Sequence, residues 1–123
     1  GLPPDTRESM KETLEFAKSN LTEAFNIYPA QALPGSPLYN EAKKQNWDLP
    51  TRYSGYSMLS YYTHNTSNTN LSAAEILKAR DDSWFEYHSN PQYLSLLENK
   101  FGIEAKKSVE DMLKIKLKRW EKL

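Results

Sequence analysis

The spacing of apolar side chains predicts a helix at the start of the chain. Apolar residues stand four, three and four positions apart, which places them on one face of a helix over residues 6–20: Met10, Leu14, Ala17 and Leu21. Asp5 and Glu8 have the spacing of a capping box, and two prolines precede them. We therefore expect the helix to begin directly after Asp5.

A different pattern follows, in which β-favouring residues precede a proline. Phe25, Ile27 and Tyr28 favour extended backbone, whereas Pro29 cannot donate to a central ladder. This pattern predicts one short strand at 24–28. Because one strand cannot form a sheet, we expect it to pair with a strand outside this chain. The opening at Gly1, with no element before the first helix, likewise suggests a segment of a longer protein.

The middle of the chain combines a helix with a long loop. Ser36 is a good N-cap and Pro37 fits the first helical position, so we expect a helix over 36–46. Residues 51–70 are rich in tyrosine in their first half and in polar turn formers in their second half. A loop of this length inside a compact domain is often functional. The alternative is that its aromatic side chains pack over the body as a lid.

Three more helices are predicted towards the end of the chain. Ser72 and Glu75 form a capping box, and the apolar residues flanking them form a staple, which predicts a helix to about His88. Asn90 and a following proline begin the next helix, which ends near Phe101 at a glycine. A last helix is expected over 104–121.

Composition excludes several classes of function. Sixteen basic residues balance sixteen acidic ones, so we expect neither nucleic acid nor an anionic membrane as a partner. No apolar run approaches the ~20 residues of a membrane span, and we expect a cytoplasmic protein. The chain has no cysteine and therefore no thiolate ligand for a metal or an iron–sulfur cluster.

Few residues suggest chemistry by type and spacing alone. His64 and His88 stand too far apart to share a metal, so we assign no metal ligand and no catalytic residue. Asp82 and Glu86 fall on one helical face, and a solvated face is the better interpretation. Arg80 lies among aromatic residues, which is typical of cation–π packing or of a side chain that reaches for solvent.

Several stretches together resemble one enzyme family. Residues 1–10, GLPPDTRESM, resemble a segment written GLPGDT.ES, and residues 26–39, NIYPAQALPGSPLY, resemble a strand and its exit. Residues 47–50, 53–56, 71–75 and 90–94 resemble a helical C-terminal region. In this order they are similar to radical S-adenosylmethionine enzymes with a cobalamin-binding domain, such as magnesium-protoporphyrin IX monomethyl ester cyclase.

The resemblance implies an architecture and a set of binding residues. Residues 1–47 would hold the last β/α elements of a partial (β/α) barrel, and residues 48–123 a helical extension with the aromatic loop at 51–70. The fold class would thus be mainly α with one short strand. Residues near S-adenosylmethionine would be Gly1, Leu2, Tyr28, Ala30 and Gln31. Residues contacting substrate or another domain would be Tyr53, Tyr56, Tyr61 and Tyr62.

The family's chemistry needs groups that this chain lacks. The three cysteines that hold the [4Fe–4S] cluster are absent, so this segment alone would be inactive. The parent enzyme would bind S-adenosylmethionine, the cluster and cobalamin, and would catalyse methyl transfer or oxidative cyclisation of a small-molecule substrate. The partner of this segment would be the rest of that chain. The alternative is a free-standing helical interaction module without catalysis.

Overall fold

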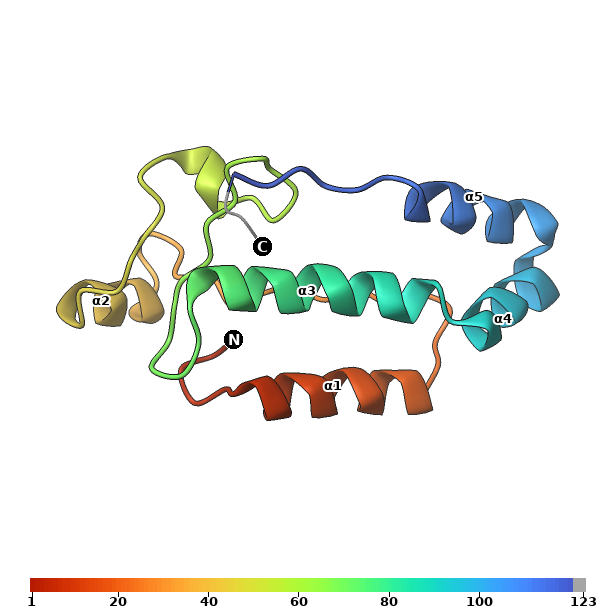
Figure 1. Ribbon diagram of the computed structural model, residues 1–123, viewed down its shortest axis with the longest axis horizontal. Helices are drawn as coiled ribbons and strands as arrows, with labels where there is room; N and C mark the ends of the chain where they lie inside the picture. Colours follow the sequence, from red (N-terminus) through yellow and green to blue (C-terminus); the bar gives the residue numbers. More distant parts are fainter. Residues whose placement is uncertain (121–123) are drawn as a thin grey trace.

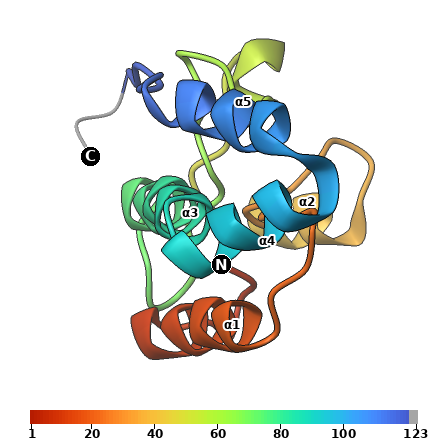
Figure 2. The ribbon, with the colours of Figure 1, turned by 90° about the vertical axis from the view of Figure 1, so that its right-hand side faces the viewer.

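The computed structural model describes residues 1–120, and the regular elements within that range are all helical. The elements are α1 Arg7–Ser19, α2 Pro37–Lys44, the 3-10 helix η1 Tyr53–Tyr56, α3 Ala73–His88, α4 Pro91–Phe101 and α5 Ile103–Leu113. Helices α1 and α3 lie side by side along the long axis, and α4 with α5 closes one end (Figure 1). Viewed from that end, α1, α3 and α5 lie in successive layers (Figure 2). The mainly helical class is therefore confirmed.

The predicted helix starts are confirmed with one shift. The Ser36 hydroxyl accepts from the Tyr39 amide at 3.1 Å at the start of α2, and Ser72 with Glu75 forms the capping box of α3. At α1 the capping box is formed by Thr6 and Ser9. The preceding aspartate instead accepts from the Leu2 amide at 2.7 Å, closing a turn before the helix. The cap thus moves by one residue.

The predicted strand at 24–28 is not formed within residues 1–120, because no neighbouring strand is available to make a ladder. The segment is nevertheless strand-like in its burial, with exposed and covered residues alternating from Leu21 to Tyr28. It runs back along α3 towards α2, opposite in direction to α1 (Figure 1). Its inner face includes Phe25, whose ring stacks on Tyr87 at 4.0 Å.

Side chains take the place of a ladder along this segment. The Tyr87 hydroxyl accepts from the Thr22 amide at 3.0 Å and donates to the Thr22 carbonyl at 3.1 Å. Tyr93 donates to the Glu23 carbonyl at 3.2 Å, and Arg80 Nε donates to the Ile27 carbonyl at 3.3 Å. Arg80 is thus buried on a specific partner and does not reach for solvent.

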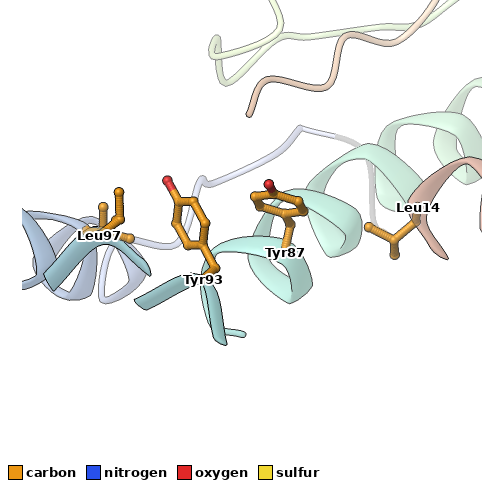
Figure 3. Close-up of a cluster of buried hydrophobic side chains, with 5 residues drawn as sticks. Leu14, Tyr87, Tyr93 and Leu97 are labelled. Atoms are coloured by element: carbon orange, nitrogen blue, oxygen red, sulfur yellow. The ribbon is translucent and has the colours of Figure 1, made fainter. Parts of the chain in front are cut away.

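One apolar core joins four of the helices and the extended segment. Its buried members come from α1, α3, α4 and α5, and Figure 3 labels the first four of them: Leu14, Tyr87, Tyr93, Leu97 and Val109. Burial of aromatic and aliphatic side chains of this size is the main stabilising term in a small domain. Ion pairs Arg7–Glu75 and Lys18–Glu86 then fix α1 parallel to α3.

The last predicted helix is shorter than expected. Helix α5 ends at Leu113, and residues 114–120 run back across the molecule as irregular chain (Figure 1). The Trp120 amide donates to the Tyr61 carbonyl at 2.8 Å, and Arg119 is bound to α3. Tertiary hydrogen bonds therefore override the helical pattern, and residue 121 of the prediction lies outside the described residues.

Candidate functional site

Part of the polar half of residues 51–70 lies inside, and the tyrosines of the other half are more exposed. Thr63, Asn65 and Thr66 are 1%, 0% and 3% exposed, whereas Tyr53 is 92% exposed. Tyr53 therefore does not fit the lid interpretation, in which the aromatic side chains cover the body, whereas Tyr61 and Tyr62 are 46% and 40% exposed and so are more than half covered. Tyr56 is more covered than these, and burial raises the pKa of its hydroxyl.

The buried polar side chains of this loop clamp the end of the extended segment. Asn65 Nδ2 donates to the Ala30 carbonyl at 3.0 Å, and the Ala32 amide donates to Thr66 Oγ1 at 3.0 Å. Gln31 Nε2 lies 3.0 Å from the His64 carbonyl and 3.2 Å from the Gly55 carbonyl. Because buried polar groups cost free energy unless they are paired, these bonds fix the loop on residues 30–32.

The residues predicted to lie near a cofactor are partly brought together. Gly1 and Ala30, far apart in sequence, line one small hollow with Pro3 and Thr66. The chain end lies between α1 and α3 (Figure 1), where a side chain in place of Gly1 would meet Ile76. Leu2 and Tyr28 are 57% and 67% exposed, and Gln31 is engaged with the loop as described.

The tyrosines predicted to meet substrate or another domain divide into two groups. Tyr61 and Tyr62 meet edge to face at 5.0 Å, and Trp120 lies 6.4 and 6.3 Å from their ring centroids. Tyr53 stands apart on η1 with nearly its whole side chain in solvent. The structure thus adds Trp120 to the predicted set and builds an aromatic cluster from Tyr61, Tyr62 and Trp120.

A cleft of about 390 Å³ opens beside this aromatic cluster. Its walls are residues 48–52, Gly55 of η1, and the side chains of Tyr62, His64 and Trp120. Gly55 is needed there, because a Cβ at this position would approach Pro50 to 2.6 Å. The cleft is within the ~300–1,000 Å³ that small-molecule sites occupy.

Three ionisable side chains line this cleft. Asp48 Oδ2 lies 3.0 Å from His64 Nε2, at ion-pair distance. The Arg52 guanidinium lies over the Tyr62 ring, 4.3 Å from its centroid, which is a favourable cation–π position. The arrangement offers hydrogen-bond donors and ring faces on the same side of the molecule.

Arg119 locks the segment that supplies Trp120. Its guanidinium donates twice to Asp81, at 2.9 and 2.8 Å, and its Nη1 donates to the Ser60 carbonyl and to Thr63 Oγ1. Asp81 also accepts from Arg80 at 2.9 Å. The Arg119 side chain is only 4% exposed, so the charge is held by paired, forked hydrogen bonds.

Other sequence interpretations of charged residues are settled by their contacts. Asp82 pairs with Lys78 and Glu86 with Lys18, all on the outer surface, which confirms the solvated face. No group of histidine and carboxylate side chains within residues 1–120 is arranged to hold a metal ion.

The cleft itself was not predicted. Tyr62 was singled out by type, but Trp120 comes from a distant part of the chain, and no motif links Asp48 and Arg52 to either ring. The bond between Arg119 and Asp81 likewise spans 38 positions. Only an abundance of aromatic residues near both segments pointed to this end of the molecule.

Comparison with known proteins gives no relative for this chain. No family model, no curated protein and no solved structure matches it. None of the helices formed by residues 1–120 is both long and apolar enough to cross a membrane.

Proposed function

We propose that this chain is the C-terminal part of a cobalamin-type radical S-adenosylmethionine enzyme, in which residues 1–47 complete the end of the barrel and residues 48–123 form a helical cap. The motifs at residues 1–10 and 26–39 support this proposal by their order and spacing. In a barrel enzyme the carboxyl ends of the strands carry the site. The parent enzyme would act on a small molecule, and this segment would supply a wall and a cap.

One observation carries the proposal. Gly1 and Pro3, which would follow the fifth strand, line the same hollow as Ala30, which would end the sixth. Neighbouring parallel strands bring their carboxyl ends to one edge of a barrel, so the two exits are expected to meet. The reversed direction of the extended segment relative to α1 also suits a helix followed by a strand (Figure 1).

The backbone of the extended segment supports the same function. Within residues 1–120, none of the amide N–H groups from Glu23 to Tyr28 donates a hydrogen bond to another part of the chain. Backbone donors of a strand-like segment are normally satisfied by a neighbour. In the proposed parent enzyme, those neighbours would be adjacent strands.

The implied cofactors do not fit on this chain alone. The hollow beside Gly1 has no room even for a water-sized sphere, far below the ~300 Å³ at which small-molecule sites begin. A [4Fe–4S] cluster needs cysteine ligands, and the sequence has none. S-adenosylmethionine, the cluster and cobalamin would therefore be held mainly by other parts of the parent enzyme.

The proposal is tested first by the coding sequence upstream of Gly1. A triplet of cysteines in the order Cys-x3-Cys-x2-Cys, in the same reading frame, is the expected result. A start codon directly before Gly1 would contradict the proposal.

A thermal melt followed by circular dichroism, with dye binding to exposed apolar surface, separately tests whether this chain is a segment of a longer enzyme. We expect strong dye binding while the helical core is still folded, since the outer face of residues 22–28 would lack its neighbours. A sharp transition with little dye bound would count against it.

The second candidate function is a free-standing helical interaction module. The observation in its favour is the shared core of α1, α3, α4 and α5, which buries Leu14, Tyr87 and Leu97 without any further element. A cooperative melt together with a start codon before Gly1 would favour this module over the enzyme segment.

A further inference from the structure

The two charged side chains at residues 48–52 of the cleft, Asp48 and Arg52, have different neighbours. Asp48 Oδ2 has His64 Nε2 beside it at 3.0 Å, within ion-pair distance. Within residues 1–120, Arg52 has no carboxylate at ion-pair distance, and its guanidinium carbon lies over the Tyr62 ring, 4.3 Å from the centroid. A guanidinium that contacts a ring in this way keeps N–H groups that can donate hydrogen bonds to a ligand.

Aromatic surface adjoins this cation. Tyr62 and Trp120 line the cleft and remain 40% and 67% exposed, with ring centroids 6.3 Å apart and ring planes 41° apart. Exposed aromatic rings beside an open cleft offer apolar area and ring faces to a flat molecule. The Trp120 backbone is held by Tyr61, so this wall is fixed in position.

We infer that this cleft binds a small conjugated carboxylate, with its carboxylate on Arg52 and its flat body against Tyr62 and Trp120. A guanidinium fork matches a carboxylate in a bidentate way. A phosphate suits the cleft less well, because its second negative charge would face Asp48 in the same wall. The inference goes beyond the proposed function, since the cleft lies wholly within this chain and needs no part of a parent enzyme.

The test is an amide NMR titration of the 123-residue chain with naphthoate, and with naphthamide as its neutral counterpart. We expect naphthoate to shift the signals of residues 48–64 and Trp120, and naphthamide to bind at least about tenfold more weakly, since it lacks the charge-assisted bonds. Equal binding of the two probes would overturn the inference. Equally tight binding of inorganic phosphate would also overturn it, because the ring walls would then contribute nothing.

Three variants assign the effect to Arg52. We expect Arg52→Gln to weaken naphthoate binding about tenfold and to leave naphthamide unchanged, and Arg52→Lys to give an intermediate loss, because the charge remains and the fork does not. Lys11→Gln removes the same charge from the exposed surface of α1 and serves as the matched control.

Because the Arg52 side chain is exposed, these variants should keep the dispersed amide spectrum of the unsubstituted 123-residue chain. The same NMR experiment records that spectrum. Unchanged naphthoate affinity in a folded Arg52→Gln variant, or an equal loss in Lys11→Gln, would overturn the inference.

Discussion

Two regions of this protein have interiors of opposite character, one apolar and one polar. Around α3 and α4 the interior is apolar, with Tyr87 and Tyr93 among leucine and valine side chains. Around residues 57–66 the interior is polar, with Thr63, Asn65 and Thr66 buried on backbone groups. The first region gains from area removed from water and tolerates some change of shape. The second depends on the hydrogen bonds that it makes, because an unpaired buried polar group is costly, and within residues 1–120 Asn65 Oδ1 is buried without such a bond.

The two regions meet on the extended segment that precedes α2. Its first half packs Phe25 on Tyr87, and its last residues bond to Asn65 and Thr66. A segment without backbone ladder bonds is thus held at one end by the apolar core and at the other by the polar loop. Substitutions in the two regions are therefore expected to differ in how much they destabilise the protein and in how far along the chain their effects extend.

The largest effect is expected in the apolar region. We predict that Tyr87→Ala lowers the free energy of unfolding by about 4 kcal/mol, because it removes a fully buried ring and leaves a cavity. Urea denaturation measures this change. As its control, Tyr87→Phe keeps the ring and loses only the bonds to Thr22, and should cost about 1–2 kcal/mol. Equal losses in the two variants would contradict an apolar origin.

The next largest effect is expected where the polar region is latched to α3. Arg119→Met should cost about 3 kcal/mol, because it leaves buried acceptors on Asp81, Ser60 and Thr63 with fewer donors. Hydrogen exchange should accelerate mainly in residues 57–66 and around Trp120. Lys114→Met removes an exposed pair with Asp111 and should leave both measurements unchanged. Acceleration spread evenly over all helices would contradict a local latch.

A single buried hydroxyl gives a smaller test of the polar region. Thr66→Val has nearly the same shape but leaves the Ala32 amide without its acceptor, and should cost about 1–2 kcal/mol in urea denaturation. Thr66→Ser retains the hydroxyl and should lose less. If valine proved as stable as threonine, shape and not hydrogen bonding would hold this region.

The smallest effect is expected from pH at the end of α3. Burial lowers the pKa of His88 below 6.5, so the unfolded chain binds a proton more readily than the folded one. The free energy of unfolding should therefore fall as the pH drops below about 6.5, and be fully present above it. Melting temperatures recorded across that range measure the change, and His88→Gln should reduce the slope. An identical slope in that variant would assign the pH dependence to other groups.

Local signals in the sequence were sufficient for most of the helices. Ser72 with Glu75, Ser36 with Pro37, and Asn90 before a proline each mark a helix start through bonds made within one turn. Such caps need no information from distant residues. The shift of the first cap from Asp5 to Thr6 was a local error, whereas tertiary hydrogen bonds shortened the last helix.

The candidate site was less accessible to prediction, for a physical reason. Tyr62 attracted attention by its type, but its neighbours Arg52 and Trp120 come together only after the chain has folded back. Residues 63–66 belong to the polar, turn-rich half of the predicted loop, and Asn65 and Thr66 are buried there because they satisfy the backbone of residues 30–32. Their composition alone does not distinguish a solvated turn from a buried one.

The sequence by itself determined the helices, their caps and the break at Gly102, since these depend on propensities and hydrogen bonds a few residues apart. Only the tertiary structure decided the conformation and the hydrogen-bond partners of residues 22–33, because an extended segment takes its hydrogen bonds from whatever lies beside it. The same holds for residues 114–120, where Arg119 bonds to α3 in place of a helical continuation. Contacts between distant residues thus placed the cleft, the aromatic cluster and the polar interior.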